Sequence, residues 1–229
     1  MAIIKLKNIR KDYGHFKLNV SMEIDRGITA ILGSSGAGKT TLLRIIALLE
    51  SFEGEYYFMG EKANDKHRRK ITMVFQNPVV FRGTVMDNIL YALSLDGKPD
   101  RRKAEKILEK LNLIDLANKK AKLLSGGEKQ RLCIAMALAI DREVYIFDEP
   151  TSNLDVENAR IVEKCILELA RKGKTVIIAT HNLFQARRLA DKVAFMYDGK
   201  LIEYGETKQI FEEPKNELTR RFISGDVYY

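Results

Sequence analysis

One eight-residue segment constrains the fold of this chain more than any other, because residues 33–40 read Gly-Ser-Ser-Gly-Ala-Gly-Lys-Thr. An apolar run, Ile28 to Leu32, leads into the segment, and a helix-like stretch, Thr41 to Leu49, follows at once. A G-x-x-x-x-G-K-T turn between a strand and a helix directs several backbone N–H groups and the helix N-terminus at one anion. The sequence therefore predicts a strand, a polyphosphate-binding turn and a helix in direct succession.

This turn supplies the first candidate binding residues. Lys39 would place a positive charge beside the β- and γ-phosphates, and the Thr40 hydroxyl suits Mg²⁺, which keeps waters and takes few protein oxygens. The alternative is a glycine-rich strand-to-helix turn that carries a surface lysine, and the complete motif with its flanking strand and helix favours phosphate binding. The predicted binding residues are Gly33, Ser34, Ser35, Gly36, Ala37, Gly38, Lys39, Thr40 and Thr41.

A second candidate feature is the apolar strand Val144 to Phe147, which ends in two carboxylates, Asp148 and Glu149. Successive strand residues point to opposite faces, so the two carboxylates cannot share one task. One can hold Mg²⁺ through water, while the other orients and deprotonates an attacking water. An acidic turn before Pro150 is the alternative, and the phosphate-binding turn favours the catalytic interpretation.

Two hydrophobic periods alternate along the chain and indicate an α/β fold. Residues 18–24 alternate apolar and polar, as in a half-buried strand of an antiparallel edge sheet, whereas short apolar runs predict central parallel strands covered on both faces. Helical spacing recurs between them, as in Val156 to Lys172. The predicted central strands are Ile28 to Leu32, Ile71 to Phe75, Val144 to Phe147 and Thr175 to Ala179.

Residues 78–124 break this alternation and predict helices only. No repeat or linker divides the chain, so a single domain, 1–229, is expected, in which 78–124 forms a helical subdomain and 1–77 with 125–229 forms the core. The predicted helices follow Thr84, cover Asp100 to Leu111 and lie near Leu113 to Ala117.

Composition narrows the class of protein. Hydrophobic residues make up 45% and charged residues 31% of the chain, which excludes disorder. The longest apolar run, Leu132 to Ile140, is less than half of the roughly 20 residues needed for a membrane-spanning helix. Residues 1–7 lack a signal-peptide pattern, so a cytoplasmic location is expected.

Cys133 and Cys165 are expected to be free thiols that form neither a disulfide nor a metal site.

The segment Leu124-Ser125-Gly126-Gly127-Glu128-Lys129-Gln130-Arg131 resembles the signature of ABC ATPases. Ser125 and Glu128 also form the pattern of a capping box for a helix over Lys129 to Ile140, and both interpretations can hold together. The resemblance implies a P-loop NTPase core with a mainly parallel central sheet, an N-terminal antiparallel β subdomain and an inserted α-helical subdomain. It also implies that Ser125, Gly126 and Gly127 bind the γ-phosphate of a nucleotide held by the opposite subunit.

Three further residues match the family's motifs by position. Gln76 resembles the glutamine that reaches Mg²⁺ and the attacking water, and His181 resembles the histidine that contacts the γ-phosphate. Asp155 resembles the key residue of a loop at the dimer interface, although a helix N-cap is the alternative. The resemblance implies ATP and Mg²⁺ as cofactors, with catalysis assigned to Glu149, His181, Lys39 and Gln76 and the metal to Thr40, Gln76 and Asp148.

Adenine stacking is assigned to an aromatic residue near the N-terminus. Tyr13 resembles the family's stacking aromatic, and Phe16 is a competitor because any aromatic face can stack on a base. The neighbouring His15, and His67, match no motif.

The resemblance as a whole implies the ATP-hydrolysing subunit of an ABC transporter. It would work as an ATP-dependent head-to-tail homodimer on the cytoplasmic face of the membrane, through separate permease subunits and indirectly with a solute-binding protein. Residues 79–81, Val-Val-Phe, are the candidate permease dock, and a place in the local core is the alternative.

Three segments resemble the phosphate and tungstate importer branch of this family. An oxyanion importer is therefore expected, and Gln76 to Val79 leans towards tungstate or molybdate, although other subunits select the cargo. The segments are Val74 to Pro78, Thr84 to Ile89 and Thr219 to Gly225.

Two other classes of protein are alternatives to a transporter subunit. A non-transport ABC ATPase acting on nucleic acid or ribosomes would explain the net charge of +8, but the basic clusters are scattered and mostly offset by acidic residues. The chain also lacks the coiled coils or tandem domains of such proteins, so no nucleic-acid partner is expected. A small-molecule P-loop kinase would leave residues 124–131 and Asp155 without a role.

Overall fold

A mixed β-sheet is the scaffold of the molecule, and the computed structural model describes residues 2–226 of the chain. Within these residues ten strands pair in the order β5-β4-β1-β2-β10-β9-β3-β8-β7-β6. The strands are β1 (Ile4–Asp12), β2 (Lys17–Ile24), β3 (Gly27–Leu32), β4 (Glu53–Phe58), β5 (Glu61–Lys62), β6 (Ile71–Val74), β7 (Val144–Asp148), β8 (Thr175–Thr180), β9 (Lys192–Tyr197) and β10 (Lys200–Glu206). The helices are α1 (Lys39–Ile46), α2 (Val85–Ser94), α3 (Arg101–Lys110), α4 (Gly126–Ala139), α5 (Val156–Arg171), α6 (Leu183–Leu189), α7 (Thr207–Glu212), α8 (Glu217–Ser224) and the short 3₁₀ helices η1 (Asp65–Lys70), η2 (Ile114–Leu116) and η3 (Ala121–Leu123).

The parallel part of the sheet determines where the candidate site lies. Strands β3, β8, β7 and β6 are parallel neighbours, and β9 runs parallel to β3 on its other side. Because the carboxyl ends of parallel strands meet at one edge, the segments that follow β3, β6, β7 and β8 come together there. The predicted α/β fold is confirmed.

The prediction that Ile71 to Phe75 is a central strand is wrong. Strand β6 pairs only with β7 and ends the sheet. An apolar run indicates that the faces of a strand are covered, and it carries no information about the strand's place in the sheet order.

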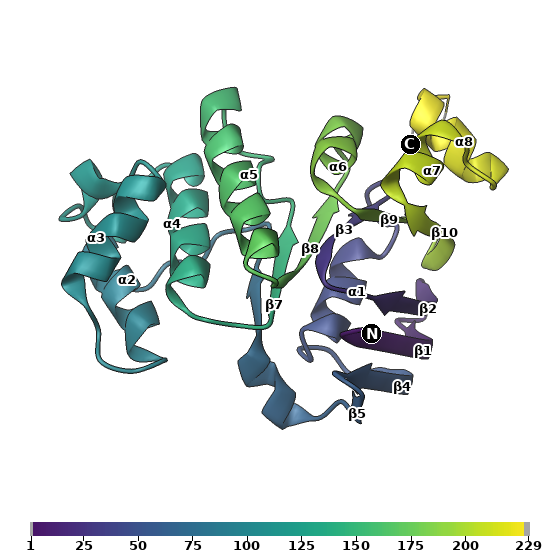
Figure 1. Ribbon diagram of the computed structural model, residues 1–229, viewed down its shortest axis with the longest axis horizontal. Helices are drawn as coiled ribbons and strands as arrows, with labels where there is room; N and C mark the ends of the chain where they lie inside the picture. Colours follow the sequence, from purple (N-terminus) through teal and green to yellow (C-terminus); the bar gives the residue numbers. More distant parts are fainter. Residues whose placement is uncertain (1, 227–229) are drawn as a thin grey trace.

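The antiparallel part of the sheet comprises β1, β2, β4 and β5, and β10 joins it to the rest by pairing Lys200 with Asn19. Strand β2 alternates exposed and buried residues, as predicted for a half-buried strand. Helix α1 lies between this part and the parallel strands (Figure 1). Its apolar side chains share one core cluster with residues of both parts, among them Ile4, Leu6, Leu42, Leu43, Ile45, Ile46, Ile146 and Ile177.

Two helices begin earlier than the sequence predicted, because of how their N-termini are capped. Helix α1 starts at Lys39, since Gly38 takes the left-handed N-cap conformation with φ 96°. Helix α4 starts at Gly126: the Ser125 hydroxyl accepts a hydrogen bond from the N–H of Glu128, and the Glu128 carboxylate accepts one from the N–H of Ser125. The predicted capping box is confirmed, and both glycines form the first turn of α4.

The segment between β6 and β7 is helical. Helices α2 and α3 pack with α4 at one side of the molecule, at the left of Figure 1, and their buried leucines and alanines belong to one cluster. Side chains cap all three helices: Thr84 caps α2, Asp100 caps α3 and Ser125 caps α4. A single bridge between Thr84 and Lys120 closes this part of the chain.

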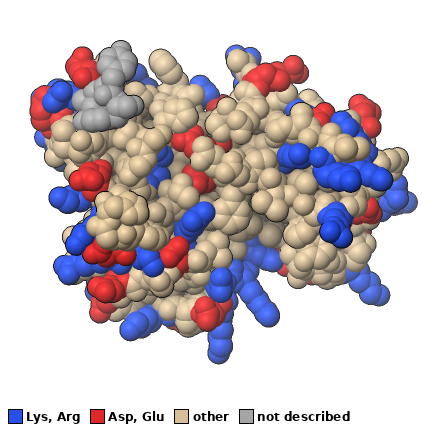
Figure 2. All heavy atoms as spheres, turned by 180° about the vertical axis from the view of Figure 1, so that it is seen from behind, with Lys and Arg blue, Asp and Glu red and all other residues tan. Residues whose placement is uncertain are grey.

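The structure also bears on the sequence-based predictions about membrane spans, cysteines and surface charge. Among residues 2–226, no helix has both the length and the apolar content to span a membrane. Met1 of the N-terminal segment lies outside the described residues. Cys133 in α4 and Cys165 in α5 are free thiols. On the face shown in Figure 2, Lys and Arg side chains are spread from one end to the other with Asp and Glu among them.

Candidate functional site

A cavity of about 760 Å³ lies at the carboxyl edge of the parallel strands. It brings together residues that the sequence placed in several separate motifs, including the phosphate-binding turn, the acidic pair and the candidate adenine-stacking aromatics. The lining residues are Tyr13, His15, Phe16, Ser35, Gly36, Ala37, Gly38, Lys39, Thr40, Thr41, Arg44, Gln76, Asp148, Glu149 and His181.

The turn that forms the floor of this cavity requires glycine at two positions. A Cβ atom at Gly33 would lie 2.4 Å from the carbonyl oxygen of Met196, and one at Gly38 would lie 2.7 Å from Cζ of Phe16. Both residues also have positive φ, 157° and 96°, which L side chains rarely adopt. Helix α1 follows directly, so the N–H groups of its first turn border the same cavity.

Lys39 is held inside this turn. Its ammonium group donates hydrogen bonds to the carbonyl oxygens of Gly33 at 2.7 Å and Ser34 at 2.9 Å. Burial lowers the pKa of Lys39, and the negative charges of Glu149 and Asp148 act in the opposite direction. The turn therefore holds the amine at the lining of the cavity.

The first carboxylate of the acidic pair is joined to the turn. The Thr40 hydroxyl donates a hydrogen bond to Oδ2 of Asp148 at 2.7 Å, and Asp148 is almost fully buried. Burial raises the pKa of Asp148, although the Thr40 hydrogen bond opposes this shift. A buried carboxylate beside a hydroxyl is a pair of hard oxygen donors, and these residues fit a magnesium ion.

The second carboxylate lies in a strained backbone position. Glu149 has φ 48°, uncommon for a residue with a side chain, and its N–H donates to the carbonyl oxygen of Ala179 at 2.9 Å. Its Oε1 lies 2.9 Å from Nδ1 of His181, which follows β8. Adjacent parallel strands thus bring together an acid and a histidine separated by more than 30 residues in the chain.

Six of the predicted binding residues do not line the cavity: Gly33 and Ser34 at the start of the turn, and Ser125, Gly126, Gly127 and Asp155. Asp155 caps helix α5, because its Oδ1 accepts a hydrogen bond from the N–H of Asn158 at 2.8 Å. A Cβ at Gly127 would lie 3.0 Å from the carbonyl oxygen of Asn153. The start of α4 and the loop before α5 are therefore neighbours that together form a second candidate surface.

Two residues that line the cavity, Arg44 and His15, were not predicted from the sequence to be binding residues. Arg44 lies one helical turn after Thr40, and that i, i+4 spacing was the available signal. His15 matches no motif, yet it lies in the lining beside Tyr13. His67 has a structural role: its Nδ1 accepts a hydrogen bond from the N–H of Asn64, and its ring packs on Phe58.

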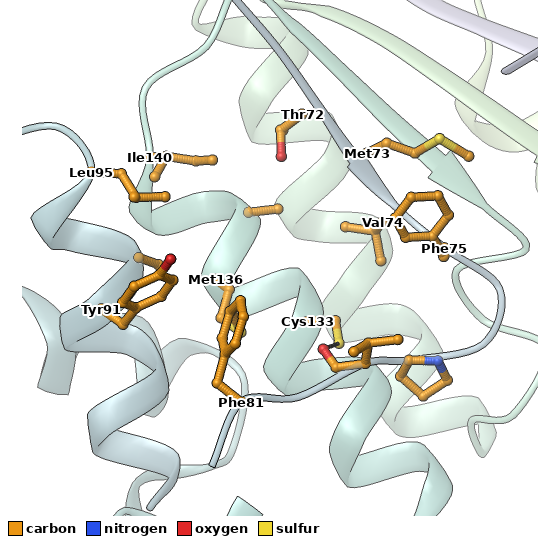
Figure 3. A pocket seen from close by; sticks show the side chains of 14 residues that line it. Thr72, Met73, Val74, Phe75, Phe81, Tyr91, Leu95, Cys133, Met136 and Ile140 are labelled. Carbon is orange, nitrogen blue, oxygen red and sulfur yellow. Dashed lines mark hydrogen bonds between the residues drawn. The ribbon is translucent and has the colours of Figure 1, made fainter. Parts of the chain in front are cut away.

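A separate apolar groove of about 450 Å³ lies between β6 and the helices α2 and α4. Figure 3 shows side chains from all three elements and the segment after Gln76 turned toward it. Phe81 and Tyr91 pack edge to face there, with ring centroids 4.7 Å apart. Val79 is 72% exposed and Phe81 is also exposed, so neither belongs to the local core. The lining residues are Thr72, Met73, Val74, Phe75, Pro78, Val79, Phe81, Tyr91, Ala92, Leu95, Cys133, Met136, Ala137 and Ile140.

The parallel sheet, the glycine-rich turn before α1 and the acidic end of β7 define a P-loop nucleoside triphosphatase. Residues 18–152, more than half of the chain, match the family described as "ABC transporter". This chain belongs to the ABC transporter family, and it is an ATP-binding protein and an ATP hydrolase.

Comparisons with individual proteins agree with this placement. The phosphate import ATP-binding protein PstB of Thermotoga maritima is 42% identical and aligns over 98% of each chain. The protein of the same name from Pyrobaculum aerophilum is 37% identical over the full length of both. Among solved structures, the dimeric post-hydrolysis state of the ATP-binding cassette MJ0796 with ADP and Pi has a TM-score of 0.80 at 30% identity, covering 89% of this chain and 98% of that one.

Proposed function

We propose that this chain is the ATPase subunit of a phosphate importer, in which two copies, head to tail, enclose two ATP molecules. The observation that carries the proposal is the split of the predicted site. The turn, Asp148 and Glu149 line one cavity, whereas the start of α4 and the loop before α5 lie outside it. A second copy would complete each site. The likeness to a dimeric cassette supports this arrangement.

Within each site the phosphate-binding turn would hold the phosphates. Backbone N–H groups of residues 33–41 and the Lys39 ammonium would bind the β- and γ-phosphates, and Ser125 to Gly127 of the second copy would bind the γ-phosphate from the opposite side. Thr40, Asp148 and Gln76 would hold Mg²⁺ directly or through water. When bound, this ion offsets negative charge on the phosphate oxygens.

Hydrolysis requires a base for the attacking water. Glu149 would accept a proton from that water, because it lines the same cavity as the phosphate-binding turn. Its 2.9 Å contact with His181 orients the carboxylate. Lys39 and His181 would then stabilise the charge on the transferred phosphoryl group.

The apolar groove would receive the membrane partner. Its lining includes Phe75 and Pro78, on either side of Gln76 in the sequence, and its exposed Val79 and Phe81 offer contact area without charge. A short apolar segment of a permease would fit there, so that residues 78–124 act as the subdomain that couples the nucleotide site to transport. This would place the chain on the cytoplasmic face of the membrane.

The cargo is proposed from the relatives. The two relatives described above align with this chain over nearly their full length, and both are named phosphate import proteins. Their names support phosphate as the cargo rather than tungstate or molybdate. A solute-binding protein and permease would select the ion.

Replacement of Glu149 by Gln tests the proposal. We expect Glu149→Gln to bind ATP with wild-type affinity, to form a stable dimer with ATP and Mg²⁺, and to lose at least about a hundredfold in kcat. Sedimentation velocity and phosphate release measure these properties, with wild-type protein as the control. A monomer at saturating ATP with its membrane partner present, or normal phosphate release, would contradict the assignment. In vesicles containing the whole transporter, competition between radiolabelled phosphate and tungstate tests the cargo.

A further inference from the structure

A second connection joins the loop that follows Glu149 to helix α6, which follows His181 in the chain. Nε2 of Gln185 donates hydrogen bonds to Oγ1 of Thr151 at 2.8 Å and to Oε1 of Glu163 at 3.1 Å. Thr151 lies two residues after Glu149, and Gln185 lies four residues after His181 on α6. The amide bridge therefore spans the same two loops as the Glu149–His181 contact.

Glu163 anchors this bridge to helix α5. It is only 6% exposed, and its carboxylate forms two bonds with the Arg188 guanidinium, at 3.1 Å from Nε and 2.6 Å from Nη2. Such a bidentate pair fixes geometry as well as charge. Gln185 is 1% exposed, and both donor positions of its amide are used. Rotation of this amide would direct its carbonyl oxygen at the Glu163 carboxylate, which can only accept a hydrogen bond, so the orientation of the amide is fixed.

We propose that Gln185, Thr151 and Glu163 are positioning residues for ATP hydrolysis, which set the distance between the loop of Glu149 and the loop of His181. The inference rests on the catalytic roles proposed above for those two residues. The physical reason is the sensitivity of proton transfer to geometry: a displacement of about 1 Å can cost about a hundredfold in rate. An apolar contact would join α6 to the loop just as firmly, but it would not fix direction as two hydrogen bonds do.

The Thr151 hydroxyl allows a matched test. Thr151→Val keeps the shape of the side chain and removes the acceptor, whereas Thr151→Ser keeps the acceptor. We expect Thr151→Val and Gln185→Leu each to lower kcat about tenfold with KM for ATP within about twofold, and Thr151→Ser to retain kcat. The double variant should be no slower than the slower single variant, because both remove one shared bond.

A glutamine far from the site serves as the control for stability. Nε2 of Gln209 donates to Oε1 of Glu203 at 2.9 Å, in a half-buried pair between α7 and β10. Gln209→Leu should lower the melting temperature without changing kcat. If Thr151→Val and Gln185→Leu also lower only the melting temperature, the bridge is structural and the inference is wrong.

Glu149→Gln separates this outcome from a failure of the proposed function. If Glu149→Gln stops hydrolysis while Thr151→Val is as fast as Thr151→Ser, only the positioning role is refuted. If Glu149→Gln hydrolyses ATP normally, the proposed base itself is refuted. Should Gln185→Leu fail to fold, the comparison of Thr151→Val with Thr151→Ser still decides.

Discussion

At the scale of single residues, two aromatic side chains are candidates for the proposed stacking on adenine, Tyr13 and Phe16. Tyr13 is 41% exposed in the cavity, and the Lys11 ammonium lies 5.3 Å from its ring centre. Phe16 is half-buried, packs on the core cluster of α1 and stands against Gly38. One ring is free to meet a base, and the other supports the phosphate-binding turn.

We therefore expect different losses from the two truncations. Tyr13→Ala should weaken ATP binding about tenfold, since stacking contributes about 1–3 kcal/mol per base, and leave the melting temperature nearly unchanged. Phe16→Ala should cost roughly 2 kcal/mol of folding free energy, because it removes a packed side chain. Calorimetric titration with ATP and thermal unfolding measure the two effects. The opposite pattern would make Phe16 the stacking residue.

The carboxylate of Glu128 gives the capping box a pH dependence. The hydrogen bond from the N–H of Ser125 lowers the pKa of Glu128 below its ordinary value of 4.5. A lowered pKa in the folded state stabilises the fold above pH 4.5, and this stabilisation is lost as the pH falls through the lowered value. Urea unfolding of wild type and Glu128→Gln should differ most above pH 4.5 and converge in acid. A difference independent of pH would show that the charge is irrelevant to the cap.

At the scale of elements, the first turn of α4 has two glycines in different surroundings. A Cβ at Gly126 meets nothing within 4 Å, whereas one at Gly127 approaches Asn153 and Leu154. In a single copy, only the second position is sterically restricted. A second copy bound here, as proposed above, would occupy the open space next to Gly126.

Gly126→Ala should consequently separate folding from activity. We expect its free energy of unfolding to be unchanged or up to about 1 kcal/mol higher, because Ala favours a helix over Gly. Hydrolysis should fall about tenfold or more, since the new methyl group would obstruct the phosphate of the second copy. Gly127→Ala is the comparison, and it should lose stability as well as activity. Full hydrolysis by Gly126→Ala would contradict the shared site.

The elements also show what the sequence could and could not predict. The turn at 33–40 and the capping box were predictable because their residues are contiguous and their geometry is local. The helix starts differed by two or three residues, because glycines at a helix start weaken the periodic signal. The place of β6 at the end of the sheet and the Gln185 bridge were not predictable, because both depend on pairing between distant segments.

At the scale of the whole molecule, the nucleotide cavity and the apolar groove lie on either side of the short stretch around Gln76, which lines the cavity just before Pro78 enters the groove. A partner in the groove and a nucleotide in the cavity would both act on this stretch. The sequence indicated only part of this groove, at residues 79–81, because the rest of its lining comes from separate elements.

A charge in the groove should break the link to the membrane. We expect Val79→Asp to retain the melting temperature and ATP affinity of the isolated subunit, because Val79 is exposed, and to abolish co-purification with the permease subunits. Leu49→Asp, at an exposed leucine outside the groove, is the control and should co-purify normally. Pull-down from detergent-solubilised membranes measures both. Equal retention of the two variants would place the dock elsewhere.

The central position of α1 has a consequence for how such a machine can move. The helix whose start borders the proposed phosphate site also packs, through its apolar side chains, against both parts of the sheet. A shift of α1 would disturb the packing on both of its sides, so we expect the phosphate-binding turn to stay in place relative to the sheet. We therefore expect any motion driven by ATP to occur in the peripheral helices and at the interface between the two proposed copies.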